Sequence, residues 1–120
     1  MTEPPTPTPG LLIHNVYFSL KEPTPEKRQR LIDACHRLLP AHPGIVFFAC
    51  GARAEGLDRD VNDRDFDVGL HIVFTDQEAH DRYQDAPLHL RFIQECQDDW
   101  RQVRVFDSVA RGGPAGETTL

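Results

Sequence analysis

The chain has 120 residues, 39% of them hydrophobic, which fits one small globular domain with a modest core. Its formal net charge of -6 and pI near 5.4 argue against nucleic acid or an anionic membrane as the main partner, because phosphate binding requires a basic stripe. No stretch approaches the roughly 18 apolar residues of a membrane span. The three cysteines form no C-x-x-C pair. We therefore expect a cytoplasmic protein with reduced thiols.

Both ends of the chain have the composition of disordered segments. Residues 1–10 contain four prolines, and residues 109–120 are rich in glycine and threonine, so neither can bury enough apolar surface to offset the entropy of ordering. The predicted folded domain therefore spans residues 11–108.

The first half of this domain predicts a strand, a helix and a second strand. Apolar side chains alternate with other residues over 12–20, the period of a strand with one mainly apolar face. A threonine followed by a proline then begins a pattern of helical spacing, which predicts a helix over 25–39. The apolar run at 45–50 predicts a second strand, buried on both faces.

The second half predicts a strand, an interrupted helix and a last strand. Alternation over 66–74 indicates the third strand, and Thr75 to Glu78 match a capping box that begins a helix. Pro87 interrupts this helix and begins a second helical segment that reaches residue 100. A short strand over 103–107 completes the domain.

The resulting order, β-α-β-β-α-β, predicts an α+β fold, a ferredoxin-like sandwich with its helices on one face of a four-stranded sheet. The opposite face would carry Tyr17, Val73 and Phe106, with either Val46 or Phe48. Apolar groups on an uncovered face predict a homodimer that associates through this open face of the sheet.

Three side chains are candidates for chemistry. His14 interrupts the apolar face of the first strand, so it is either a core histidine with satisfied nitrogens or an acid, base or ligand contact in a cavity. Tyr83 and His89 flank the proline break, where two helical segments meet. They supply a phenol and an imidazole for general acid–base work on a carbonyl or phenolic substrate. Alternatively, Tyr83 packs in the core and His89 caps the broken helix.

Three segments in this order carry a family resemblance: the strand at 14–20, the strand at 66–70 and the segment 83–89. Together they resemble the stress-responsive dimeric α/β-barrel (Dabb) family over about residues 12–107. The resemblance implies a ferredoxin-like fold in which two sheets associate face to face as a dimeric α/β barrel.

The same resemblance implies site residues. In a plant member of the family, olivetolic acid cyclase, a strand-one histidine and a Tyr-plus-His pair flank the cavity where a polyketide chain is closed by an aldol reaction. By motif position these are His14 and Tyr83 as hydrogen-bonding partners and His89 as general base. Members of the family often read His-Pro-x-His before the second helical segment. Ala86 replaces the first of these histidines, which argues against a retained cyclase reaction.

No cofactor or metal motif is predicted. The residues from Asp58 onward, which begin in the acidic surface loop at 53–64, echo a calcium loop, but the sixth position of that pattern is Asp63 rather than glycine and the twelfth is Gly69 rather than glutamate. Paired histidine motifs are absent from the sequence, so a metal site would require convergence in space. His71 is expected to face a partner subunit. Solvated faces or turns are expected for the remaining histidines: His36, His42 and His80.

Two functions remain open. One is a dimer that binds a small hydrophobic or phenolic molecule, without catalysis, in a cavity between sheet and helices. The other is a cofactor-free cyclase or lyase acting on a polyketide-like carbonyl compound. A monooxygenase-like relative and a structural interaction protein are further alternatives. Catalysis requires His89 to be accessible from a cavity and near Tyr83 or His14.

Overall fold

The computed structural model describes residues 10–112, so most of the two predicted tails lies outside the described residues. Within this range, no helix has the length and hydropathy needed to cross a membrane. The strands and helices follow one another as β1 (Leu11–Leu20), α1 (Pro25–Leu38), β2 (Ile45–Ala52), β3 (Val68–Phe74), α2 (Gln77–Asp85), α3 (Pro87–Cys96) and β4 (Trp100–Ala110).

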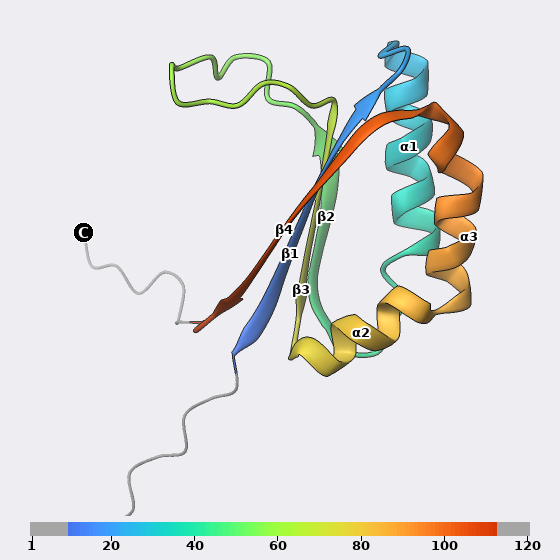
Figure 1. Cartoon of the computed structure of the whole chain (residues 1–120), viewed down its shortest axis with the longest axis vertical. Coiled ribbons are helices and arrows are strands. Elements are labelled where there is room, and N and C mark those ends of the chain that lie inside the picture. The colour runs from blue at the N-terminus through green and yellow to red at the C-terminus, as the bar shows by residue number, and fades with distance from the viewer. Residues whose placement is uncertain (1–9, 113–120) are drawn as a thin grey trace, which may run out of the picture.

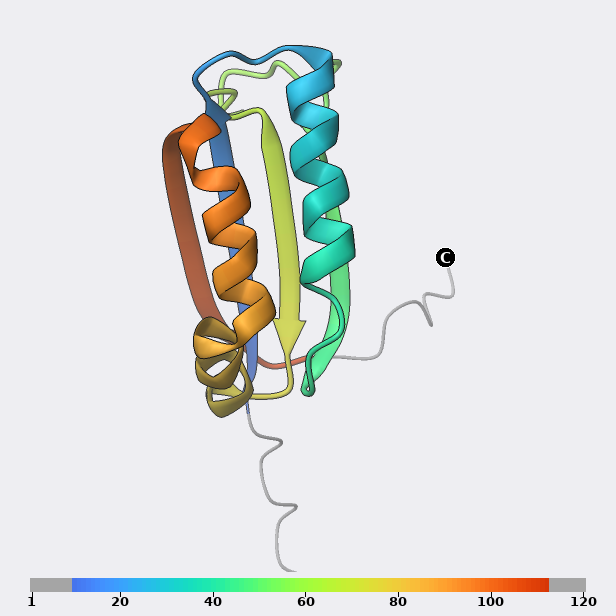
Figure 2. The same ribbon diagram turned by 90° about the vertical axis from the view of Figure 1, so that its right-hand side faces the viewer.

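The four strands form one antiparallel sheet in the order β2-β3-β1-β4. All three helices lie on one face of it, and the other face is open (Figure 1). In the view onto the helices, α1 and α3 run side by side and α2 lies across the end of the layer (Figure 2). The fold is therefore ferredoxin-like, as the sequence predicts.

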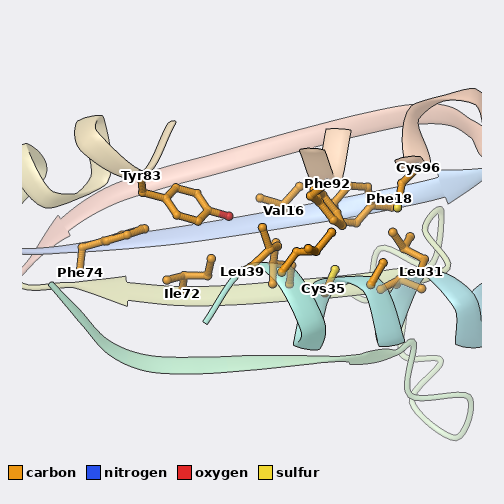
Figure 3. Close-up of a cluster of buried hydrophobic side chains, with 14 of the residues drawn as sticks. Val16, Phe18, Leu31, Cys35, Leu39, Ile72, Phe74, Tyr83, Phe92 and Cys96 are labelled. Atoms are coloured by element: carbon orange, nitrogen blue, oxygen red, sulfur yellow. The ribbon is translucent and has the colours of Figure 1, made fainter. Parts of the chain in front are cut away.

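The core lies between this sheet and the helices. The apolar positions of β1 alternate as predicted, and Val16 and Phe18 are 5% and 2% exposed. Leu31 and Cys35 of α1 and Phe92 of α3 meet them from the other layer (Figure 3). Burial of each such apolar side chain stabilises the fold by about 1.5–3 kcal/mol. The core thus fixes the helix-facing side of β1, where His14 also lies.

Several predicted element ends shift in the structure, among them the start of α2 and the end of β4. The capping residue of α2 is Asp76 and not Thr75, because Asp76 Oδ1 accepts a hydrogen bond from the Ala79 amide at 2.8 Å. Thr75 instead extends the sheet region, and its amide donates to the Gly44 carbonyl at 2.8 Å. The last strand continues to Ala110, so the predicted domain boundary at residue 108 lies inside β4.

The second predicted strand was wrong in its burial. Val46 and Phe47 are 53% and 57% exposed, because β2 is an edge strand that pairs only with β3. A register shift between residues 45 and 47 sets Phe47 opposite Val73 on the open face, whereas Phe48 packs near His36 of α1. The open face therefore carries Phe47, and Phe48 lies on the helix-facing side.

Trp100 was predicted to lie on the second helical segment, but α3 ends at Cys96. A short 3₁₀ turn, Gln97–Asp99, follows, and Trp100 begins β4. Its indole still reaches the core, with ring centroids 5.0 Å from Phe18 and 5.8 Å from Phe92. The helical spacing of this tryptophan therefore indicated its contact with the core correctly and its element incorrectly.

Gly44 occupies the turn before β2 with a φ of +92°, a conformation that side chains other than glycine rarely adopt. A Cβ at this position would lie 2.4 Å from the Cβ of Ala79. The turn therefore requires glycine both for its backbone conformation and for the close approach of α2.

Replacing Gly44→Ala should lower the free energy of unfolding by at least about 1–2 kcal/mol, because alanine must adopt a left-handed conformation and displace α2. Urea denaturation followed by circular dichroism measures the effect. The matched control is Gly56→Ala, where an added Cβ meets nothing within 4 Å. Equal denaturation midpoints for the two variants would contradict the prediction.

Candidate functional site

A cavity of about 300 Å³ lies between β1 and β4 of the sheet and helices α2 and α3. Its wall is polar at one end and apolar elsewhere. The polar lining residues are His14, His80, Gln84, His89 and Asp107, and the apolar ones are Val16, Phe18, Phe92, Ile93, Trp100, Val103 and Val105. Two of the three predicted site residues, His14 and His89, therefore line one cavity.

His14 points from β1 toward the helices and is 4% exposed. The register of β1 and β4 pairs it with Asp107, and Nδ1 lies 2.5 Å from Asp107 Oδ1. If Nδ1 donates to this carboxylate, Nε2 keeps its lone pair. Burial lowers the pKa of His14 below its ordinary value, although the hydrogen bond to Asp107 opposes this shift.

Pro87 creates the joint between α2 and α3 that holds His89. Ala86 adopts an extended conformation, as expected before a proline, so the last carbonyls of α2 lose their helical partners. His89 Nδ1 lies 3.0 Å from one of them, the carbonyl oxygen of Gln84, and donates to it. The histidine therefore caps the broken helix while its ring lines the cavity, with Nε2 as the nitrogen that can accept a proton.

Tyr83 lies behind His89 rather than in the cavity wall. Its ring centroid is 4.5 Å from that of His89 and 6.2 Å from that of His14. The side chain is 2% exposed, and its hydroxyl points into the core toward Val16 and Leu39 (Figure 3). Burial raises the pKa of this phenol, which keeps it protonated. The role of Tyr83 as a hydrogen-bond donor stays a prediction.

Two residues of the cavity were missed in the sequence. His80 was expected on a solvated face, but its side chain is 15% exposed and its ring centroid lies 4.9 Å from that of His14. Asp107 was predicted to lie in the last strand, with no role in a site. One donor atom each from His14, His80 and Asp107 lies within 4.8 Å of the others, so these side chains could hold a metal ion.

Two other histidines match their expected surroundings. His36 is exposed on α1, and His42 lies in the turn after α1, where Nδ1 is 2.7 Å from the Leu39 carbonyl oxygen. His71 lies on the open face, with Nδ1 2.8 Å from Asn15 Oδ1, and its contact with a partner subunit stays a prediction. None of these three lines the cavity.

A second hollow, of about 460 Å³, lies on the open face of the sheet. Its walls come from β1, β4 and the loop that precedes β3, which projects away from the helices (Figure 1). Arg104 of β4 donates to Asp63 of this loop at 2.8 Å and lowers the pKa of that carboxyl to about 2. Arg53 also donates to the carbonyl oxygens of Arg64 and Phe66. The predicted surface loop is thus tied to the open face.

The family described as Stress responsive A/B Barrel Domain (Dabb) matches residues 12–110. The chain belongs to the Dabb family. The match extends from β1 to the last residue of β4, so this Dabb domain includes every strand and helix described above. No curated protein matches the chain significantly.

Solved structures share the fold of this Dabb domain. A Dabb family protein with a ferredoxin-like fold from Mesorhizobium loti is 25% identical, with 86% of this chain and 99% of the other covered and a TM-score of 0.71. A dimeric ferredoxin-like protein of unknown function from Thermobifida fusca is 18% identical, with coverage of 91% and 99% and a TM-score of 0.69. The hydroxynitrile lyase of Passiflora edulis is 18% identical, with coverage of 88% and 97% and a TM-score of 0.70.

The buried His89 makes stability depend on pH. Burial lowers the pKa of His89 below its ordinary value of 6.5, and the nearby His14, His42 and His80 act in the same direction. The unfolded chain therefore takes up this proton at a higher pH than the folded chain. The contribution of neutral His89 to the free energy of unfolding is therefore complete above pH 6.5. It is lost as the pH falls through the lowered pKa.

His89→Gln should reduce this pH dependence, which amounts to at most about 1.4 kcal/mol per pH unit for one proton. The measurement is the free energy of unfolding in urea at several pH values between about 7 and 5. His36→Gln, which removes an exposed imidazole, is the control. If both variants keep the slope of the unchanged protein, His89 does not make this contribution.

Proposed function

We propose that this Dabb domain binds a small, partly apolar molecule with a carbonyl or phenolic group in the cavity between its sheet and helices α2 and α3. This proposal rests on the cavity wall, which is polar at one end and apolar elsewhere. An apolar pocket with a few convergent polar groups is the usual form of a ligand site. Its volume of about 300 Å³ fits a small aromatic compound or a short chain.

The polar end of the cavity offers complementary hydrogen-bonding groups. His14 and His89 each have one ring nitrogen engaged by the protein, which leaves the other nitrogen for a ligand.

General acid–base chemistry in the same cavity is the second candidate function. The observation that favours it is the pairing of His89 with Gln84, which fixes the imidazole with Nε2 as the proton acceptor. The lowered pKa of His89 keeps it neutral near pH 7, so Nε2 is free to accept a proton. A hydroxynitrile lyase has the same fold. In this candidate function, His89 removes a proton from the ligand, His14 Nε2 accepts a hydrogen bond from a ligand hydroxyl and Tyr83 supports the ring of His89.

We also propose that the chain is a homodimer that associates through the open sheet face. Tyr17 and Phe106 of this face lie in contact, with ring centroids 5.8 Å apart, and Phe47 and Phe106 are 57% and 54% exposed. Exposed aromatic side chains on one face favour burial against a second subunit. Solved ferredoxin-like structures that resemble this chain are described as dimeric. The dimer leaves the ligand cavity on the opposite side of each sheet.

Ligand binding can be followed through Trp100, because it is the chain's single tryptophan and lines the cavity. Small phenols and aromatic aldehydes should change its fluorescence in a saturable way and raise the melting temperature. Native mass spectrometry of protein purified from its own host should show a retained small molecule. Val105→Phe narrows the cavity without adding a second tryptophan, and it should therefore weaken ligand binding.

The same samples separate the two candidate functions. Mandelonitrile, an aromatic hydroxynitrile, serves as the reactive compound, and release of benzaldehyde is followed by absorbance. Turnover that His89→Gln abolishes while binding persists would establish acid–base chemistry. Saturable binding without turnover of this compound supports a binding function alone. No fluorescence change with any compound, together with no retained molecule, would contradict both functions.

The dimer is tested by replacing Phe106→Glu, which places a carboxylate in the proposed interface, where its desolvation is costly. Light scattering coupled to size exclusion should report a dimer for the unchanged chain and a monomer for this variant. Leu90→Glu is the matched control, because Leu90 is 53% exposed but lies on α3. A monomeric unchanged chain at micromolar concentration would refute the proposed dimer.

A further inference from the structure

We propose that His14, His80 and Asp107 form a binding site for a divalent transition-metal ion at the polar end of the cavity. The three side chains come from β1, α2 and β4, and one donor atom of each lies within 4.8 Å of the other two. They form the only such cluster of three or more histidine, cysteine or acidic side chains found among residues 10–112.

The donor set suits an ion that keeps open coordination positions. Two imidazoles and one carboxylate are the ligands of several catalytic zinc sites and of non-haem iron sites, in which the remaining positions hold water or substrate. All three side chains line the cavity, so those positions face its interior. With both imidazoles neutral, the three side chains carry only the negative charge of the carboxylate. This charge attracts a divalent cation and is more than neutralised by it.

A carboxylate orients His80 from the side away from the cavity. His80 Nδ1 lies 3.0 Å from Asp81 Oδ1, which directs the proton to Nδ1 and leaves Nε2 as the ligand nitrogen. Metal-binding histidines commonly donate their other nitrogen to a carboxylate in this way. The amide nitrogen of Gln84 lies 3.4 Å from His80 Nε2 and donates to it, so an ion would displace this contact and a rotated Gln84 amide could offer its oxygen as a further ligand.

Small movements of these three side chains would allow them to coordinate an ion. A tetrahedral zinc ion bound at about 2.0–2.2 Å holds its ligand atoms roughly 3.3–3.5 Å apart. Spacings of up to 4.8 Å therefore have to contract, the 2.5 Å between His14 Nδ1 and Asp107 Oδ1 has to widen, and Asp107, whose side chain is 40% exposed, has room to rotate. The ion would replace the hydrogen bond as the link between His14 and Asp107.

The test uses the metal alone, so its outcome does not depend on the ligand binding proposed above. Chelator-treated protein is titrated with Zn²⁺ by calorimetry, and one ion per chain should bind. His80→Gln and Asp107→Asn should each weaken the affinity by roughly tenfold or more. The control is His36→Gln, which removes an exposed histidine and should leave the affinity unchanged.

Two spectroscopic measurements identify the ligands without relying on the variants. Zn²⁺ should shift the side-chain nitrogen resonances of His14 and His80 in ¹⁵N-histidine-labelled protein, but not those of His36 or His71. Co²⁺ should give visible d–d bands without the near-ultraviolet bands of thiolate ligands, which excludes the three cysteines. The proposal is overturned by an absence of binding, by thiolate bands, or by equal affinity in His80→Gln.

Discussion

The pairing register between β1 and β4 is the constraint on which the candidate site depends, because it sets Asp107 opposite His14. His14 lies on the helix-facing side of a central strand, where its imidazole is withdrawn from water and requires a partner within the fold. The carboxylate supplies that partner from an edge strand and remains partly exposed. A slip of one residue along β4 would turn Asp107 to the other face and leave a buried imidazole unpaired.

The proline between α2 and α3 adds the second part of the site. Pro87 prevents one continuous helix, and the freed carbonyl of Gln84 is bound by His89. A helix terminus buried without such a partner would be costly, so the same contact stabilises the joint and orients the imidazole. Tyr83 packs behind that ring and closes it off from the core. Structural and chemical explanations of His89 are therefore compatible, since capping uses one ring nitrogen and leaves the other free.

The two faces of the sheet have separate properties. The helix-facing side contains the core and the cavity, whose polar end gathers three histidines and a carboxylate. The open side carries aromatic residues and the loop that Arg104 and Arg53 hold in place. Association of two subunits through the open side would bury apolar surface without obstructing the cavity. This separation would let one small domain combine the proposed subunit interface with the proposed ligand site.

Local patterns in the sequence predicted the order of strands and helices, the ferredoxin-like fold and the orientation of His14, because periodicity and proline positions report local burial and backbone geometry. They placed Tyr83 and His89 at the helix joint for the same reason. Which side chains meet depends on packing in three dimensions. Asp107 lies 93 positions from His14 in the sequence, and His80 reaches His14 from α2. The exposure of β2 at the sheet edge was likewise a matter of strand order. Contacts of this kind depend on register and on the packing of layers, which no local pattern encodes.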